Sequence, residues 1–144
     1  MKSRSLILES NLDIARKWAS LLDVEAFDEL PAMLHPECEY GSPKGVVLGA
    51  QEIVDTYLRN AVWAHETFDY IAWESEIAPE SDGRIRITFI DKTRHRGVDH
   101  VYRCQQYIHI DENGRIDRIE HEAIESEEKA LKAFFDRVGV RRSG

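Results

Sequence analysis

His121 is the residue whose type and position in the chain best suit acid–base chemistry. It lies in the segment RIEHEAI, where alternation places Ile119, His121 and Ala123 on one face of an expected strand. Because an unperturbed histidine has a pKa of roughly 6.5, a histidine that faces a pocket can move protons near neutral pH. A core histidine whose ring bonds a backbone or carboxylate partner fits the same pattern, so both interpretations stay open.

A second set of polar side chains follows from the alternation upstream of His121. The segment RIRITFI, residues 84–90, alternates cleanly and has one apolar face. If Arg96 pairs with Asp99 across a turn at Gly97 and Val98, this face continues over both strands of a hairpin. That register puts His95 opposite His100, Thr93 opposite Tyr102, Asp91 opposite Cys104, and Phe89 opposite Gln106.

The number of polar side chains on this face indicates a pocket with an apolar floor and a polar mouth. Each buried polar group must find a partner, so a purely structural core would not need so many. The alternative is a hairpin end that projects into water, and this applies best to His95 and His100. Asp91 is a pocket carboxylate with a pKa raised by desolvation, a partner that orients a histidine, or an exposed residue near a bend. The polar residues of the face are Asp91, Thr93, His95, His100, Tyr102 and Gln106.

Helical spacing and breakers predict the elements that position these side chains. We expect helices over residues 9–23 and from Gly49–Ala50 through Val62. A short helix between them would be capped by Asp23 and kinked or broken at Pro31. A short strand and a loop fill residues 37–48, and strands joined by tight turns follow from residue 67.

The end of the chain is expected to form one more helix, over residues 126–138. Ser126 is its predicted N-cap, and Gly139 suits its C-terminal end. The pattern as a whole predicts a single α+β domain over residues 1–144.

Composition and charge narrow the classes of function. The chain has 144 residues, is 42% hydrophobic and carries a net charge of −8, which disfavours a long groove for nucleic acid. No apolar run approaches the roughly 20 residues of a membrane span. The N-terminus lacks the apolar region of a signal peptide, so we expect a cytoplasmic protein. The outer face of the hairpin should pair with glutamates of neighbouring strands, although Lys92 would face Arg103; its basic residues are Arg84, Arg86, Lys92, Arg94 and Arg103.

The two cysteines and the indole of Trp18 give weaker signals. Cys38 and Cys104 have no CxxC spacing, so we expect reduced thiols, no metal and no cofactor. A metal site at Asp91 and the two hairpin histidines is a minor alternative. Nothing near Cys104 would lower its pKa, so we do not expect a nucleophile there. Trp18 is either plain core or a wall of the pocket.

The order and spacing of these segments resemble the nuclear transport factor two-like superfamily, and within it the SnoaL-like polyketide cyclase and ketosteroid isomerase types. The resemblance covers about residues 9–125 and rests on WASLLDVEAFDELPAMLHPECEY, LGAQEIVDTYL and ENGRIDRIEHEAI. It implies a cone-shaped, curved antiparallel or mixed sheet that wraps an apolar pocket. Three N-terminal helices would close the cone, a C-terminal helix would be added to it, and a homodimer would form through the sheet.

The resemblance also implies roles for single residues. In the isomerase type, the tyrosine donor, the aspartate base and the protonated acid match Trp18, a position near Ser42, and Gln106. All three differ in type here, so steroid isomerisation is disfavoured. In the cyclase type, the acid–base aspartate matches His121, and its histidine partner again matches Gln106. A dehydratase-like arrangement would use His100, His121, Tyr40 and Tyr102.

Three functions follow from the residues and the resemblance together. The first is an enzyme that performs acid–base chemistry of the cyclase, isomerase or dehydratase kind on a small apolar carbonyl or hydroxyl compound. His121 and His100 would be its catalytic residues. The second is a module that binds such a compound without chemistry. The third is a dimeric assembly module with a filled cone. The expected ligand-binding residues are Trp18, Tyr40, Asp91, Tyr102 and Gln106.

Overall fold

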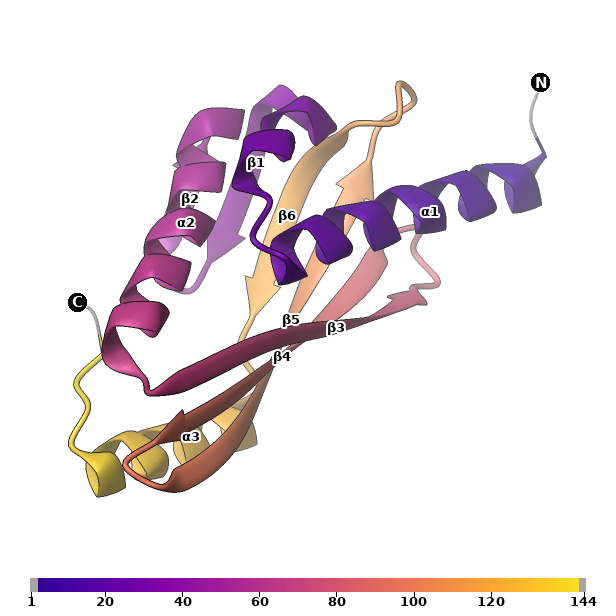
Figure 1. Ribbon diagram of the computed structural model, residues 1–144. Helices are drawn as coiled ribbons and strands as arrows, with labels where there is room; N and C mark the ends of the chain where they lie inside the picture. The colour runs from indigo at the N-terminus through magenta and orange to yellow at the C-terminus, as the bar shows by residue number, and fades with distance from the viewer. Residues whose placement is uncertain (1–2, 143–144) are drawn as a thin grey trace.

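The fold is a six-stranded mixed sheet with helices on one face and across one end (Figure 1). The computed structural model describes residues 3–142. The elements in chain order are α1 (Arg4–Asp23), the 3-10 turns η1 (Phe27–Glu29) and η2 (Pro31–Met33), β1 (Leu34–Ser42), β2 (Gly45–Leu48), α2 (Ala50–Thr67), β3 (Tyr70–Pro79), β4 (Ile85–His95), β5 (Val98–Ile110), β6 (Ile116–Glu122) and α3 (Glu125–Val138).

The sheet has the order β2-β1-β6-β5-β4-β3 and curves around α1 and α2 (Figure 1). All neighbours are antiparallel except β1 and β6, which run parallel. The isoleucines of β4 and β5 that alternation predicts on one face are buried there, and Ile85, Ile87 and Ile108 have 1% exposure or less, while Phe89 on the same face is partly buried. The α+β class and the curved mixed sheet are therefore confirmed.

The N-terminal helices differ from the prediction in two details. The first helix begins at Arg4 rather than residue 9, because the Ser3 hydroxyl caps it by accepting from the Leu6 amide. Asp23 is the last residue of α1 and caps no second helix, so that prediction was wrong. The expected short helix is two 3-10 turns, and Pro31 opens the second, where its missing N–H costs nothing.

The register of the β4–β5 hairpin differs from the predicted one by two residues. Arg96 and Gly97 both have positive φ, 48° and 77°, and form a two-residue turn that matches the twist of the strands. Asp91 therefore faces Tyr102, and Thr93 faces His100. A shift of two residues keeps every side chain on its predicted face, whereas a shift of one would have inverted the strand.

The C-terminal helix α3 closes the far end of the cone (Figure 1). Leu131, Phe134, Phe135 and Val138 are buried against inner-face residues such as Tyr102. The helix begins at Glu125, and its N-cap is Ile124 without a side-chain bond, so the prediction of Ser126 was wrong. Instead, three glutamates in the first turn stabilise the helix, because their negative charges lie near the positive end of the helix dipole. Gly139 ends the helix in the left-handed conformation, as expected.

Candidate functional site

Gln106 is a buried polar side chain at the centre of the inner face, 4% exposed. Its neighbours across the strands are Ile87 on β4 and His121 on β6. The Tyr57 hydroxyl donates to its Oε1 over 2.6 Å, and its Nε2 donates to the Tyr40 hydroxyl over 3.3 Å. The same Nε2 lies 3.2 Å from His121 Nδ1. One amide thus joins side chains from α2, β1 and β6.

Aromatic rings surround this amide. Tyr57 meets Trp18 of α1 and Tyr40 of β1 edge to face, each with ring centroids 5.8 Å apart. Tyr40 and His121 lie nearly parallel, with centroids 6.4 Å apart and an angle of 23°. The structure therefore brings together Trp18, Tyr40, Gln106 and His121, four of the residues expected to bind or react.

Sequence reasoning missed Tyr57. Tyr57 lies one turn after Ile53 and Val54, which are buried in α2. The signal that could have revealed it is a tyrosine hydroxyl on a buried face, since such a hydroxyl normally finds a hydrogen-bond partner.

Burial favours the uncharged forms of the tyrosines and the histidine in this network. It raises the pKa of Tyr57 and of Tyr40, so both hydroxyls keep their hydrogens at neutral pH. It is also the main reason that the pKa of His121 is lowered; Lys44 and Arg142 add to the effect and Glu128 opposes it. His121 is accordingly neutral at pH 7.

Asp91 forms a second polar centre between Trp73 of β3 and Tyr102 of β5. Burial, with a smaller contribution from the charge of Asp23, raises its pKa to about 7. The Ser75 hydroxyl donates to Asp23 Oδ2 over 2.6 Å. Asp23 Oδ1 and Trp73 Nε1 are buried and have no hydrogen-bond partner among residues 3–142. The Asp91 side chain is half-buried, which agrees with a partly desolvated carboxyl group and not with a fully exposed one.

Tyr102 and His100 both contact residues of α3. The Tyr102 hydroxyl donates to Glu128 Oε1 over 2.6 Å, and Arg142 donates to the other oxygen of Glu128 over 2.7 Å. His100 stacks on Phe134 with ring centroids 4.8 Å apart. Since His100 lies six residues before Gln106 on β5, roughly 20 Å of strand separates it from the network. The structure does not bring His100 and His121 together.

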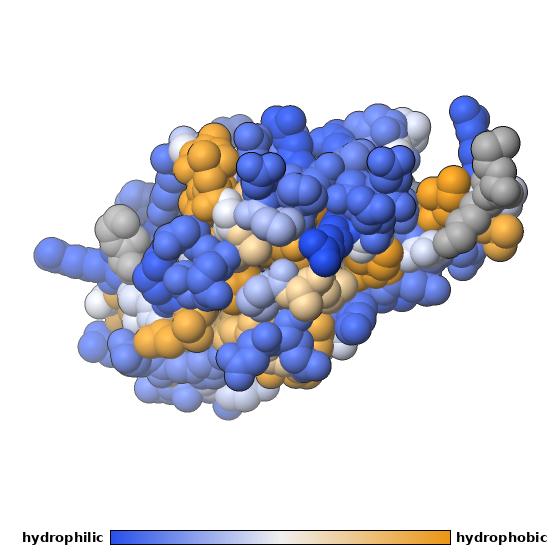
Figure 2. All heavy atoms as spheres, turned by 90° about the horizontal axis from the view of Figure 1, so that it is seen from above, coloured by the Kyte–Doolittle hydropathy of each residue, from blue (hydrophilic) through white to orange (hydrophobic). Residues whose placement is uncertain are grey.

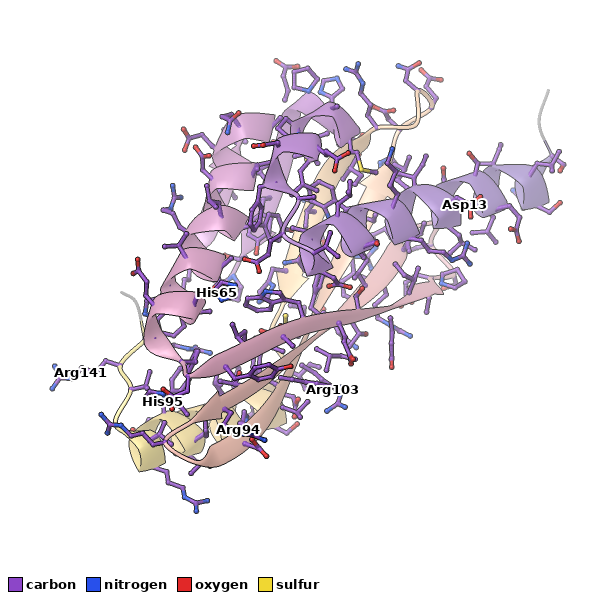
Figure 3. The ribbon with its side chains drawn as sticks, in the orientation of Figure 1. Asp13, His65, Arg94, His95, Arg103 and Arg141 are labelled. Atoms are coloured by element: carbon purple, nitrogen blue, oxygen red, sulfur yellow. The ribbon has the colours of Figure 1, made fainter. Side chains whose placement is uncertain are left out.

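The other histidines of this end lie outside the network as well. Figure 3 shows His95 near the tip of the β4–β5 hairpin beside α3, and His65 at the end of α2. His95 Nδ1 is 3.5 Å from a carboxylate oxygen of Asp69, and His65 bonds Glu25 over 2.8 Å. His65 therefore links α2 to the segment that follows α1, whereas His95 Nδ1 is buried without a hydrogen-bond partner among residues 3–142.

Burial raises the pKa of both thiols, that of Cys38 to about 12. The thiolate of Cys104 is disfavoured in addition by the charge of Asp91, so a nucleophilic role has no support. Within residues 3–142, no group of three or more His, Cys, Asp or Glu side chains is arranged to hold a metal ion.

Ion pairs cover the outer face of the sheet, as the sequence predicts. Lys92 pairs with Glu74 over 2.9 Å, and Arg84 pairs with Glu120 over 3.1 Å. The expected like-charge contact of Lys92 with Arg103 is wrong, because Lys92 faces Val101 in the observed register. Figure 2 shows the hydrophobic residues of one face as separate patches among hydrophilic ones. No helix in the described part of the chain is long and apolar enough to cross a membrane.

Searches of family models and of curated proteins found no match to this chain. Solved structures do match. An NTF2-like protein of unknown function from Burkholderia pseudomallei superposes with a TM-score of 0.63 at 15% identity, covering 85% of this chain and 96% of that one.

Two further matches carry enzyme names. A candidate polyketide cyclase from Xanthomonas campestris pv. campestris has a TM-score of 0.65 at 11% identity, with 85% and 96% of the two chains covered. A candidate scytalone dehydratase from Novosphingobium aromaticivorans has a TM-score of 0.61 at 15% identity, with 83% and 85% covered. Structural matches at identities this low establish the architecture only, because proteins of one fold can have different activities. The chain has the cone-shaped fold of the nuclear transport factor two-like proteins.

Proposed function

We propose that this chain is an enzyme that binds a small, largely apolar carbonyl or hydroxyl compound inside the cone and moves a proton on it. Asp91 is the proton acceptor in this proposal, and the network of Gln106, His121 and Tyr40 holds the polar end of the compound. The observation that carries the proposal is the buried polar network in an otherwise apolar interior, with a carboxyl group of raised pKa on the same face.

The packing of the interior supports a ligand site. Tyr40, Tyr57, Phe89, Asp91 and His121 all face inward, yet each keeps part of its surface accessible. A fully packed core leaves few voids. Partial exposure of so many inner-face residues therefore supports room for a ligand in the interior. Asp91 and Gln106 lie two inner-face positions apart, roughly 13 Å along the strands, which suits a compound of one or two rings.

The electrostatics support proton transfer near neutral pH. A carboxylate with a pKa of about 7 is a much stronger base than an ordinary aspartate, and it still ionises at physiological pH. His121 is neutral in the same range, so it can donate a hydrogen bond without adding a charge to the apolar site. The names of two structural neighbours, a cyclase and a dehydratase, are compatible with chemistry on such compounds.

The filled-cone assembly module is the second candidate, and one observation favours it. Helix α3 packs Phe134 and Phe135 against the inner-face cluster that contains Tyr102 and Phe68. A guest that enters from this end must displace α3. A module that binds a ligand without chemistry would share the site and differ only in lacking turnover.

A thermal-shift screen with small carbonyl, phenolic and polyketide-like compounds tests the proposal. A ligand at about 100 times its Kd adds about 2.7 kcal/mol to the free energy of unfolding, which raises the Tm by several degrees. His121→Asn should reduce the shift. His109→Asn is the matched control, because His109 bonds Asp117 on the outer face. Equal shifts in both variants, or no shift with any compound, would contradict the proposed site.

A further inference from the structure

The hydrogen-bond donors and acceptors around Gln106 can be counted. An amide nitrogen donates two hydrogens and accepts none, and an amide oxygen only accepts. The Gln106 nitrogen contacts Tyr40 Oη at 3.3 Å and His121 Nδ1 at 3.2 Å, so both of these atoms accept. The Gln106 oxygen accepts from Tyr57 at 2.6 Å. Both hydrogens of the amide nitrogen and one of the two acceptor positions of the amide oxygen are thereby used.

The distances favour this orientation of the amide over the flipped one. An O–H···O bond is typically 2.5–3.0 Å long, whereas N–H···O bonds are roughly 2.7–3.2 Å. The contact at 2.6 Å therefore suits the Tyr57 hydroxyl and the amide oxygen, and the two longer contacts suit the amide nitrogen. The flipped amide would place its nitrogen 2.6 Å from the Tyr57 oxygen, which is shorter than such bonds normally are.

This orientation determines where two other hydrogens point. A neutral imidazole whose Nδ1 accepts must carry its hydrogen on Nε2. Tyr40 accepts with its oxygen, so its own hydrogen remains available. Among residues 3–142, His121 forms a hydrogen bond only through Nδ1 and the Tyr40 hydroxyl only as an acceptor, so neither the Nε2–H nor the Tyr40 O–H is used. Because both side chains are held by one nitrogen and their rings are nearly parallel, the two donors belong to the same region of the site.

We propose that Gln106 is a positioning residue that holds His121 as the Nε2–H tautomer, and that His121 and Tyr40 together donate to one oxygen of the ligand. The ligand class is then a compound with a carbonyl, enolate or phenolate oxygen on an apolar body. Two preorganised donors stabilise negative charge that develops on such an oxygen. This inference rests on the ligand site proposed above, but its first test needs no ligand.

The first test is a two-bond proton–nitrogen correlation spectrum of the protein with labelled histidines. The signals of His121 among the six histidines are identified by their loss in His121→Asn. We expect a protonated Nε2 and an unprotonated Nδ1. In Gln106→Glu the carboxylate can only accept, so the hydrogen should move to Nδ1 or the ring should become charged. Gln105→Glu adds the same charge on the opposite face of β5 and should leave the spectrum of His121 unchanged.

Two results of this spectrum would overturn the inference. One is a wild-type His121 with its hydrogen on Nδ1. The other is a Gln106→Glu variant that folds and keeps the wild-type tautomer. If Gln106→Glu does not fold, Gln106→Met serves instead: loss of the amide should replace the single tautomer by a mixture, and an unchanged single tautomer would contradict the assignment.

The second test compares acetophenone with ethylbenzene, which differ in the carbonyl oxygen. Two hydrogen bonds to that oxygen should make acetophenone bind roughly 5- to 150-fold more tightly. Tyr40→Phe and His121→Phe should each reduce the preference. Equal binding of both compounds would contradict the proposed pair of donors but would agree with the proposed ligand site. Binding of neither compound counts against the ligand site, and the tautomer spectrum then decides the role of Gln106 alone.

Discussion

Gln106 shows how one residue can determine the chemistry of its neighbours. Its side chain carries no charge, yet it accepts from Tyr57 and donates to Tyr40 and His121. At this position the resemblance implied a protonated acid or a histidine, and the residue found there is an amide. The inner-face assignment of Gln106 and of His121 followed from alternation. Alternation alone could not predict their mutual contact, because it depends on the pairing of β5 with β6. The resemblance to the cyclase type did imply it, since Gln106 matches the partner of the residue at His121.

The raised pKa of Asp91 should make the stability of the protein depend on pH. Its pKa is raised to about 7, so the folded state binds the proton more tightly than the unfolded chain does. The ionised carboxylate therefore destabilises the fold increasingly as the pH rises from about 4 to 7. Asp91→Asn removes this charge and should stabilise the protein, by about 4 kcal/mol at most above pH 7.

Urea unfolding of the wild type and of Asp91→Asn over this pH range measures the effect. The gain should be small near pH 4 and reach its plateau near pH 7. Asp99→Asn is the matched control on the same hairpin, where Arg94 holds the pKa of the exposed carboxyl below its usual range. A gain that does not change with pH would contradict the buried charge. The same change should abolish turnover if Asp91 is the base.

At the scale of elements, the two-residue turn between β4 and β5 sets which side chains meet. Gly97 has φ of 77°, and a Cβ added there would meet no atom within 4 Å. Gly97→Ala should therefore cost about 1 kcal/mol through backbone strain alone. Gly41→Ala is the control, because Gly41 also has open space and its φ is not positive.

Urea unfolding of the two alanine variants separates these effects. We expect a loss at Gly97, and no loss or a slight gain at Gly41. The same loss at both positions would mean that the turn is not the one described, and that Asp91 does not face Tyr102.

The position of the β4–β5 turn and the start of α1 were predicted wrongly, because the sequence left the backbone conformation ambiguous at both places. An arginine in the left-handed region is uncommon, so the pattern favoured a two-residue turn one position later, at Gly97 and Val98, and this placement changes the register by two residues. The N-terminal start of α1 was missed because its first turns, around Leu6 and Leu8, are exposed and have no apolar face to detect. Strand faces were predictable, because their period of two is unaffected by either error.

At the scale of the whole molecule, α3 decides access to the cone. The sequence predicted the helix and its apolar stripe, but not its position, since a stripe does not say which surface it covers. In the structure the stripe covers the end of the inner face that carries His100 and Tyr102. In the proposed function those two residues therefore serve the closure, and the reactive part of the site consists of the Gln106 network and Asp91.

The homodimer through the sheet remains a proposal for the whole molecule. The outer face has partly exposed apolar groups such as Val101 beside ion pairs, and no helix among the described elements covers it. We expect light scattering to give twice the chain mass of 16.7 kDa. Val101→Glu should weaken the dimer, and Val24→Glu, at the end of α1, is the control. A monomeric mass for the wild type would contradict this assembly.

We propose that the cone holds a ligand at the Gln106 network. Backbone amide spectra of the labelled protein, titrated with naphthol, test it most directly. We expect the largest saturable shifts on the strands around Tyr40, Gln106 and His121. Shifts confined to the outer side of α3, around Lys129 and Lys132, or no shifts up to the solubility of naphthol, would contradict it.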